Sequence, residues 1–460
     1  MASKSKRARL APQRDLKKTF LYWTLAFFLV KLILIYKLPA HAWLGADGEN
    51  YIRAYEALTR DGLFSKEENL HYWPAGYPIF LWMVYGFGKS WIFLIVSIIQ
   101  SLVFACSVYF FSTQIAKTKL KKISYLVFIF LSINPTLSLA SICVGYESLA
   151  ASGILLFLGL VINDLVNPSN RQFLRNLILG AISISVISFM QPRLLLSGII
   201  CFIIWIFQRK LLRPAILLSI MAISVSTLLP STLVIRNFVA NDFVAVSTNL
   251  GTTMNLGAGD QATGYYNPYG EFGVPCNKIE GNATEIDSNL VLCVTNWYLN
   301  SPAKAAELFL NKSILFWSPW SGYLGQTGSM LRNPWLKINP ISKIASSSEE
   351  GNRLVFGPLG ATISWIWIVI YIFLLSIGFR FLWMVGGIEK FISILALSFI
   401  AINMLISLGT LGDHRQRLPI LGLSIFLQAI GIKAIFKGKG SVLVDGPALP
   451  SKVKADTNLN

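Results

Sequence analysis

The sequence predicts an α-helical polytopic membrane protein with about ten transmembrane helices and a mixed extracytoplasmic domain. Apolar runs of about 20 residues, long enough to cross a bilayer, recur along the 460-residue chain. Only 13% of the residues are charged and 54% are hydrophobic, whereas about a quarter are charged in soluble domains. Lys and Arg gather between the apolar runs, as in cytoplasmic loops. The net charge of +18 therefore reflects membrane topology, and we expect no nucleic-acid partner.

The first span is predicted at about 19–38, after the basic N-terminal residues 1–18. Its apolar run is longer than the core of a cleavable signal peptide, and no convincing small-residue cleavage site follows it. We therefore expect a cytoplasmic basic N-terminus and an uncleaved first span. The next loop, 39–75, is acidic and is expected outside the cytoplasm.

The later apolar runs are oriented by the charges that flank them. A short hydrophobic element at 76–88 is expected at the outer surface, and the basic stretch 117–122 places the following turn inside. Residues 19–233 are predicted to form an N-terminal transmembrane bundle, and 356–437 to hold the C-terminal helices. The nine later spans are expected at about 91–116, 123–141, 147–166, 176–191, 193–207, 214–233, 357–378, 391–408 and 418–436.

Residues 234–355 are predicted to form the extracytoplasmic domain, because they contain no run long enough to cross a bilayer. Cys276 and Cys293 both fall in this segment and could pair if it lies in an oxidising compartment. The last segment, 438–460, has no apolar periodicity, so a disordered cytoplasmic tail is expected.

Asp47 and Glu49 are the first candidates for chemistry, because carboxylates are costly beside hydrocarbon. A carboxylate held within hydrogen-bonding distance could accept a proton from an attacking hydroxyl. Divalent cations such as Mg²⁺ favour oxygen ligands, so a metal held by Asp47 and Glu49 is a second option, and the sequence leaves the cofactor open. A structural alternative is that Asp47 caps a helix over 48–60 with Glu49 in its first turn.

Charged residues at other outer turns could line the same site. Glu147 begins a predicted span, where it would either line the site or sit in the headgroup layer. Arg193, Arg415 and Arg417 lie at outer turns, where cations are disfavoured unless they have a partner. They could grip a lipid phosphate through bidentate hydrogen bonds. The alternative is internal pairing, for instance with Asp413, or contact with phospholipid headgroups.

Four more residues complete the predicted substrate-binding set: Tyr51, His71, Tyr77 and Lys312. The tyrosines could supply aromatic surface for a sugar or a lipid, although aromatic belts occur at membrane interfaces without any ligand. No His/Cys spacing resembles a zinc site, and no Gly-rich phosphate loop or dinucleotide fingerprint appears. The sequence therefore disfavours a nucleotide-consuming motor and a nucleotide-sugar site.

Taken in order, these segments resemble the polytopic GT-C glycosyltransferases, especially the branch of protein O-mannosyltransferases and lipid A aminoarabinose transferases. The acidic motif of the family's first loop is matched by Asp47-Gly48-Glu49, with Tyr51 four residues after Asp47. In both named branches the second acid directly follows the first, whereas Gly48 intervenes here. Further matches are Pro74-Ala75-Gly76-Tyr77-Pro78, Tyr146-Glu147-Ser148-Leu149, Pro192-Arg193, Ser247-Thr248-Asn249-Leu250-Gly251 and Arg415-Gln416-Arg417-Leu418-Pro419.

The resemblance implies transfer of a sugar, with inversion, from a polyprenyl-phosphate-linked donor to a hydroxyl of a glycan, lipid or protein acceptor. It also implies a bacterial inner membrane, contact with membrane lipids, and a site facing the periplasm. In this mechanism Asp47 orients or deprotonates the acceptor, while Arg193, Arg415 and Arg417 stabilise the departing phosphate. A lipid-linked-sugar flippase or other transporter, and a polysaccharide polymerase or ligase, are the alternative functions. The transferase requires Asp47, Glu147, Arg193 and Arg415 to meet in one cavity.

Overall fold

The computed structural model describes residues 2–37, 47–209, 214–264, 273–277, 279–317, 357–412 and 414–436. Within these ranges every regular element is a helix, and no strand occurs. The predictions for the tail 438–460 and for residues 318–356 fall outside these ranges.

The α-helices are α1 Ala2–Lys37, α2 Gly48–Asp61, α3 Asn69–Tyr72, α4 Gly76–Gly88, α5 Ile92–Ile115, α6 Lys121–Ile133, α7 Pro135–Ala140, α8 Glu147–Val166, α9 Asn170–Met190, α10 Leu194–Gln208, α11 Ala215–Asn241, α12 Leu250–Leu256, α13 Ala283–Asn300, α14 Pro302–Trp317, α17 Gly357–Val385, α18 Gly387–Gly409 and α19 Leu421–Phe436. Two 3-10 helices join them, η2 Lys89–Trp91 and η5 His414–Ile420.

Eight helical segments in the described ranges are long and apolar enough to cross a bilayer, so the chain is an integral, multi-pass membrane protein. They are Leu16–Tyr36, Gly76–Ile115, Glu147–Val166, Asn170–Met190, Ala215–Asn241, Trp365–Val385, Gly387–Gly409 and Arg415–Phe436. Two of the ten predicted spans correspond to shorter helices, since α6 has 13 residues and α10 has 15. α6 ends because Asn134 takes an extended conformation before Pro135, as residues before proline do. The count of ten spans stays a prediction.

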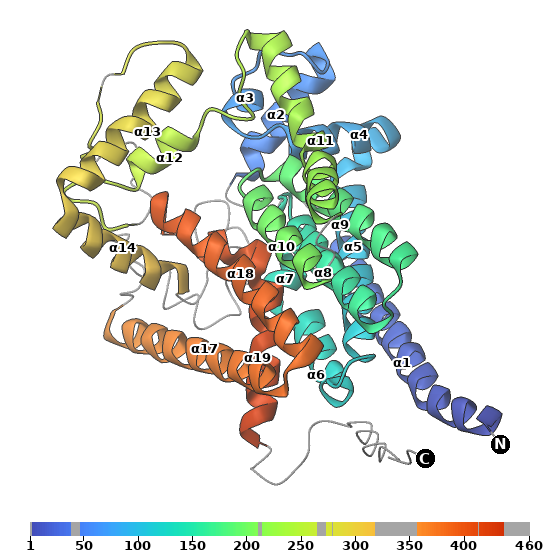
Figure 1. Ribbon diagram of the computed structural model, residues 1–460. Helices are drawn as coiled ribbons and strands as arrows, with labels where there is room; N and C mark the ends of the chain where they lie inside the picture. The colour runs from blue at the N-terminus through green and yellow to red at the C-terminus, as the bar shows by residue number, and fades with distance from the viewer. Residues whose placement is uncertain are drawn as a thin grey trace, which may run out of the picture.

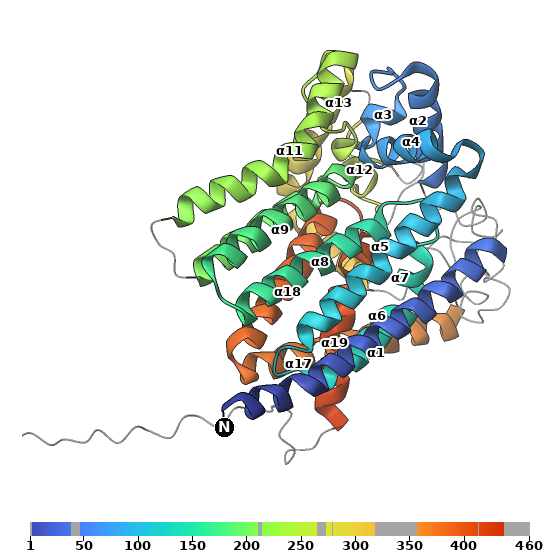
Figure 2. The same cartoon turned by 90° about the vertical axis from the view of Figure 1, so that its right-hand side faces the viewer.

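Five long helices, α1, α5, α8, α9 and α11, pack against one another in this order and lie side by side (Figure 2). The spanning part of α8 is 72% buried, whereas the spanning parts of α1 and α11 are 22% buried. The outer faces of α1 and α11 expose Leu29, Ile33, Ile216 and Ile220, as a surface in contact with lipid requires. α8 is therefore a core helix of the bundle, and α1 and α11 form its periphery.

The two ends of the bundle carry different charges. At one end Lys117 Nζ donates to Asn163 Oδ1 at 3.3 Å, and Arg209 Nε lies 3.6 Å from Asp164 Oδ2. α8 begins at Glu147 at the opposite end, and the residues from Glu147 to Asp164 span about 26 Å along the helix axis. Since the hydrocarbon core of a bilayer is about 30 Å thick, the two ends of α8 lie near the two membrane surfaces.

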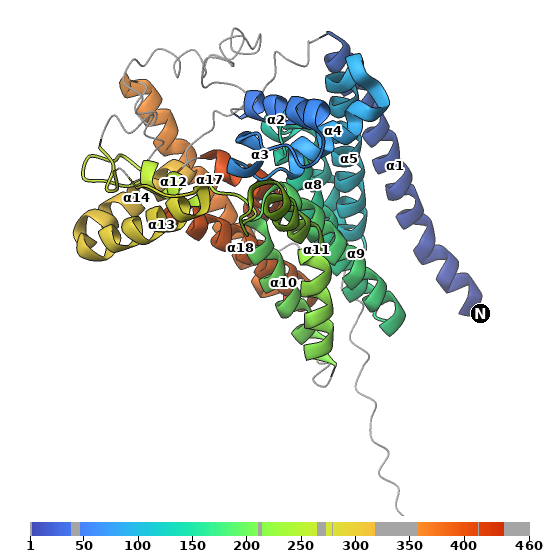
Figure 3. The ribbon, with the colours of Figure 1, turned by 90° about the horizontal axis from the view of Figure 1, so that it is seen from above.

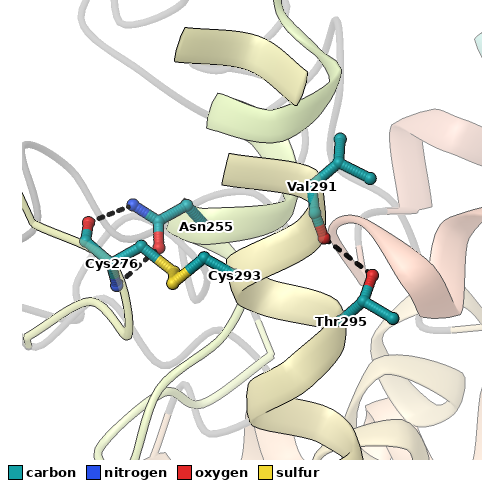
Figure 4. The surroundings of a disulfide bond; sticks show 5 residues. All are labelled: Asn255, Cys276, Val291, Cys293 and Thr295. Atoms are coloured by element: carbon teal, nitrogen blue, oxygen red, sulfur yellow. Dashed lines mark hydrogen bonds between the residues drawn. A yellow bond between two sulfur atoms is a disulfide. The ribbon is translucent and has the colours of Figure 1, made fainter. Parts of the chain in front are cut away.

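Helices α12, α13 and α14 stand beside this bundle (Figure 1). A disulfide joins Cys276, in the segment before α13, to Cys293 within α13 (Figure 4). Asn255 of α12 braces it, because its side chain donates to Cys276 O at 2.9 Å and accepts from Cys276 N at 3.2 Å. The pairing that the sequence left open is thus present.

The described part of the predicted domain 234–355 differs from expectation in two ways. Its regular elements are helices, so the mixed content that we expected is not found in these residues. α11 continues to Asn241, past the predicted boundary at 233, because no helix-breaking residue follows its apolar part until the turn at Asp242, whose φ is +61°.

The double substitution Cys276→Ser and Cys293→Ser is expected to destabilise the α12–α14 unit. A crosslink that closes a loop of 17 residues restricts the unfolded chain by about 3 kcal/mol. Limited proteolysis of the purified protein should therefore cleave the variant faster than the wild type within residues 243–317. Cys106→Ser, which removes a free exposed cysteine, is the control, and equal cleavage of the double variant and the control would contradict the expectation.

Candidate active site

The segment that leads into Glu147 is irregular and buried, which is unusual inside a membrane bundle. Residues 141–146 connect α7 to α8 without helical structure, and all of them are buried. Buried irregular backbone needs protein partners for its polar groups, because neither water nor lipid reaches them. Those partners come from α5: Ser97 Oγ donates to Ile142 O at 2.6 Å, and Gln100 Nε2 donates to Cys143 O at 2.7 Å.

Ser101 of α5 adds a further contact, because its hydroxyl donates to Ser141 O at 3.2 Å. Ser97, Gln100 and Ser101, which we call the α5 polar row, share one helix face, as residues three and four apart do. The row fixes the backbone immediately before Glu147. The spacing of these polar residues within an apolar span is a sequence signal for the row, although the predicted site did not include it.

Tyr77 links this segment to α4. Its hydroxyl donates to Gln100 Oε1 at 3.0 Å and accepts from Gly145 N at 2.8 Å. The preceding Gly76 lies so close to the carbonyl of Phe189 that a Cβ atom would overlap it. The Pro74-Ala75-Gly76-Tyr77-Pro78 run thus has a structural role, in which glycine allows the approach of α9 and tyrosine holds residue 145.

Tyr51, Tyr77 and Tyr146 form a buried tyrosine cluster. The rings of Tyr51 and Tyr77 meet edge to face with centroids 5.1 Å apart, and those of Tyr51 and Tyr146 lie 6.4 Å apart. Burial raises the pKa of Tyr146 to about 12 and raises that of Tyr51 well above its usual value. Both hydroxyls therefore stay protonated near neutral pH. The cluster packs the first turn of α2 against the start of α8.

Arg415 brings two carboxylates together at this end of the bundle. Its Nη1 lies 2.7 Å from Asp47 Oδ2, and its Nη2 lies 2.8 Å from Glu147 Oε1. Its Nε also donates to Glu147 Oε1 at 2.9 Å. Asp47 occupies the N-cap position of α2, but its side chain makes no capping hydrogen bond. The capping alternative is therefore wrong for the carboxylate, which contacts Arg415 instead.

Arg415 is itself held by α18 through the backbone on both sides of it. Ser407 Oγ donates to Leu411 O at 2.7 Å, and Asn403 Nδ2 donates to Gln416 O at 2.6 Å. Asp413, the pairing partner that we considered for the outer arginines, lies outside the described residues. Two residues of α18 thus position the loop that presents Arg415, as the α5 polar row positions the loop before Glu147.

Arg193 lies in the turn between α9 and α10, beside the same ion pairs. Tyr146, Arg415 and Glu147 all lie within electrostatic range of its guanidinium. Its Nε and Nη2 atoms are buried and have no hydrogen-bond partner among the described residues. Burial lowers the pKa of Arg193. We call Asp47, Glu147, Arg193 and Arg415 the acid–arginine cluster, which lies at the end of the bundle where α2, α3 and α4 gather (Figure 3).

Glu49 and Arg417 face away from this cluster, although each lies two positions from one of its members. Glu49 is exposed on the first turn of α2. Arg417 is buried elsewhere: its Nη1 donates to Phe316 O at 3.0 Å and its guanidinium lies 4.8 Å from the ring centre of Tyr371. Two positions along a helix correspond to a rotation of about 200°. The side chains of Glu49 and Asp47 therefore point to opposite sides of α2.

Lys312 and His71 also serve contacts within the protein. Lys312 Nζ donates to Tyr298 Oη at 2.9 Å, to Leu408 O at 3.1 Å and to Thr410 O at 2.6 Å. An ammonium has three N–H groups, so these acceptors match its full capacity. His71 Nδ1 lies 3.4 Å from Thr248 Oγ1. Lys312 thus joins α14 to the end of α18, and His71 contacts Thr248. The substrate-binding roles of both residues stay predictions.

The acid–arginine cluster combines groups that suit acid–base chemistry and anion binding. Within the described ranges no three His, Cys, Asp or Glu side chains come together as a metal site would need. Asp47 contacts Arg415 through Oδ2, and its side chain is 18% exposed. Asp47 is thus a partly exposed carboxylate that can accept a proton. Arg193, which lies near Arg415 and Glu147, has two nitrogens without a hydrogen-bond partner among the described residues, and these can bind an anion.

Glu147→Gln is expected to lower the free energy of unfolding by about 3 kcal/mol, since losing one partner of a buried ion pair leaves the other charge uncompensated. The double variant Glu147→Gln/Arg415→Gln should lose less free energy of unfolding than the sum of the losses in the two single variants. Thermal unfolding of the purified variants provides the double-mutant cycle. Glu307→Gln, which breaks the exposed pair with Lys304, should cost less than about 1 kcal/mol. Similar losses at Glu147 and Glu307 would contradict the assignment.

The burial of Lys312 is expected to make the free energy of unfolding depend on pH. Burial lowers the pKa of Lys312 from 10.5 to about 7, so between these values the folded protein binds fewer protons than the unfolded chain. Stability contributed by this site is therefore expected to rise as pH increases from about 7 to about 10.5. Lys312→Met should remove that rise, measured as the melting temperature across pH. Lys304→Met on the same helix should retain it; identical profiles for all three proteins would contradict the expectation.

No family model matches the chain, and no curated protein matches it.

Proposed function

We propose that this protein is a membrane glycosyltransferase that moves a sugar from a polyprenyl-phosphate-linked donor to an acceptor hydroxyl on the extracytoplasmic face. The observation that carries the proposal is the acid–arginine cluster. It contains a carboxylate with a partly exposed side chain, Asp47, and a guanidinium, Arg193, two of whose nitrogens have no hydrogen-bond partner in the described part of the chain. These are the two groups that displacement of a phosphate by a hydroxyl needs.

In the proposed reaction the acceptor oxygen attacks the anomeric carbon of the sugar while Asp47 takes its proton. The bond between the anomeric carbon and the phosphate oxygen breaks, and the lipid phosphate leaves with the bonding electrons, so the anomeric configuration inverts. Arg193 donates its free N–H groups to the phosphate as negative charge develops there. Arg415 holds Asp47 by Oδ2, and Glu147 holds Arg415 from the other side.

The placement of the cluster supports an extracytoplasmic site. Lys117 and Arg209 lie at the other end of the bundle, and basic residues favour the cytoplasmic side. The disulfide between Cys276 and Cys293 favours an oxidising compartment for the α12–α14 unit. We therefore propose a bacterial inner membrane with the cluster facing the periplasm. Nucleotide sugars are cytoplasmic, so a lipid-linked donor fits a site on this face.

The proposal is tested by mass spectrometry of envelope glycans and lipid carriers from cells with and without the protein. Removal should abolish one glycan product and cause its lipid-linked sugar to accumulate. Asp47→Asn should lower transfer by about 100-fold, because it removes the general base. Arg193→Gln should also lower transfer by about 100-fold, because it removes donors aimed at the developing charge.

Glu49→Gln is the matched control, since it removes a carboxylate from the same helix turn but outside the cluster. It should leave transfer unchanged at equal protein level. Normal transfer by Asp47→Asn would overturn the proposed base. Accumulation of a lipid-linked sugar on the inner face only, with no transfer activity in purified protein, would favour a flippase instead.

A further inference from the structure

Helix α14 holds the chain on both sides of Arg415, along residues 408–412 and 414–417, which we call the Arg415 segment. Lys312 Nζ donates to two carbonyls at the start of this segment, at 3.1 and 2.6 Å. At its end, Arg417 Nη1 donates to Phe316 O at 3.0 Å. Lys312 and Phe316 are buried and four residues apart, so they lie on one face of α14. One face of a helix outside the eight spanning segments therefore holds both ends of the Arg415 segment.

Close backbone contacts join the rest of the α12–α14 unit to the same segment. Gly412 N donates to Gly264 O at 2.8 Å. A Cβ atom on Gly412 would overlap the backbone of Lys312, and one on Gly257, at the end of α12, would overlap Thr410 O. The Arg415 segment and the unit thus fit together without room for a further side chain, so a change on one side of this contact must displace the other.

Arg415 connects this contact to the proposed base. Its Nη1 lies 2.7 Å from Asp47 Oδ2. The Asp47 side chain makes no capping hydrogen bond to α2, so its contact with Arg415 orients the carboxylate. A displacement of the Arg415 segment would therefore turn the group that accepts the proton in the proposed reaction.

We propose that Lys312 is a positioning residue for sugar transfer, which holds the Arg415 segment so that Arg415 orients Asp47. This role rests on the proposed function and adds a part for the α12–α14 unit, which touches neither carboxylate of the cluster through Lys312. The three N–H groups of the ammonium already have three acceptors within the protein. Lys312 therefore acts through Arg415 and not by contact with the substrate.

The first test is a transfer assay with the full-length protein in vesicles. Lipid extract from cells that lack the protein supplies the donor, envelope material from the same cells supplies the acceptor, and mass spectrometry measures the product. Lys312→Met should lower the rate at saturating extract by about 100-fold, the loss that a displacement of about 1 Å at a catalytic group can cause. The amount of extract that gives half the maximal rate should stay as in the wild type.

Hydrogen–deuterium exchange of the same proteins tests the contact without any substrate. Lys312→Met should make the amides of η5 exchange about tenfold faster, because the hydrogen bonds that hold the segment before η5 are lost. The amides of α5, which lies away from this contact, should exchange as in the wild type.

Two further variants separate positioning from a general loss of stability. Gly412→Ala pushes the Arg415 segment away from Lys312 and should reproduce both changes, the lower rate and the faster exchange. Tyr298→Phe removes one acceptor of Lys312 but leaves its two contacts with the segment in place. It should keep the saturating rate and the η5 exchange of the wild type.

A wild-type saturating rate or wild-type η5 exchange in Lys312→Met would overturn the positioning role, as would an equal loss of rate in Tyr298→Phe. A loss confined to the half-saturating amount of extract would also overturn it, since Lys312 would then bind the donor itself. Absence of transfer by the wild type would instead refute the proposed function. The exchange measurements would in that case still show whether Lys312 holds the Arg415 segment.

Discussion

One guanidinium joins three segments that are far apart in the sequence. Arg415 contacts Asp47 at the start of α2 and Glu147 at the start of α8, with N–O distances of 2.7 and 2.8 Å. The Glu147 side chain is 1% exposed, so its charge depends on this partner. Because an uncompensated charge is costly in such surroundings, the positions of α2, α8 and η5 relative to one another depend on the same pair of contacts.

The pairing requires irregular backbone inside a helical membrane protein, and the chain meets that requirement twice in the same way. Ser97 and Gln100 bind the carbonyls of the segment before Glu147, while Asn403 and Ser407 bind those of the loop around Arg415. In each case polar side chains three or four positions apart on one spanning helix satisfy a neighbouring loop. The charged residues can therefore sit at fixed positions, because the loops that carry them have little freedom.

The sequence predicted the helices and part of the cluster for physical reasons that are local. Length and hydropathy identify a span without knowledge of its neighbours. Cations at the outer turns indicated that Arg193 and Arg415 need partners, but the sequence offered a lipid phosphate, Asp413 or phospholipid headgroups, not Asp47 and Glu147. The site residues that the sequence did not place correctly depend on the direction of the side chain and on tertiary contacts. Arg417 and Arg415 lie two positions apart in one motif, but their side chains contact different parts of the protein. The sequence suggested that Lys312 binds phosphate, because its acceptors within the protein could not be predicted. They are the Tyr298 hydroxyl and two carbonyls about 100 residues away in the sequence.

Lys312 and Arg193 differ in how far the described residues satisfy their N–H groups, and this difference supports the proposed ligand. Lys312 has as many hydrogen-bond acceptors as it has N–H groups, so the protein alone accounts for it. Arg193 balances the charge of the cluster, which holds two carboxylates and two guanidiniums. Two nitrogens of Arg193 are nevertheless buried without an acceptor among the residues that the structure describes. Electroneutrality explains its charge but not its unmade hydrogen bonds, each of which costs about 1–3 kcal/mol. An anion that binds during the working cycle would supply those acceptors, and a donor phosphate has the charge and the oxygens to do so.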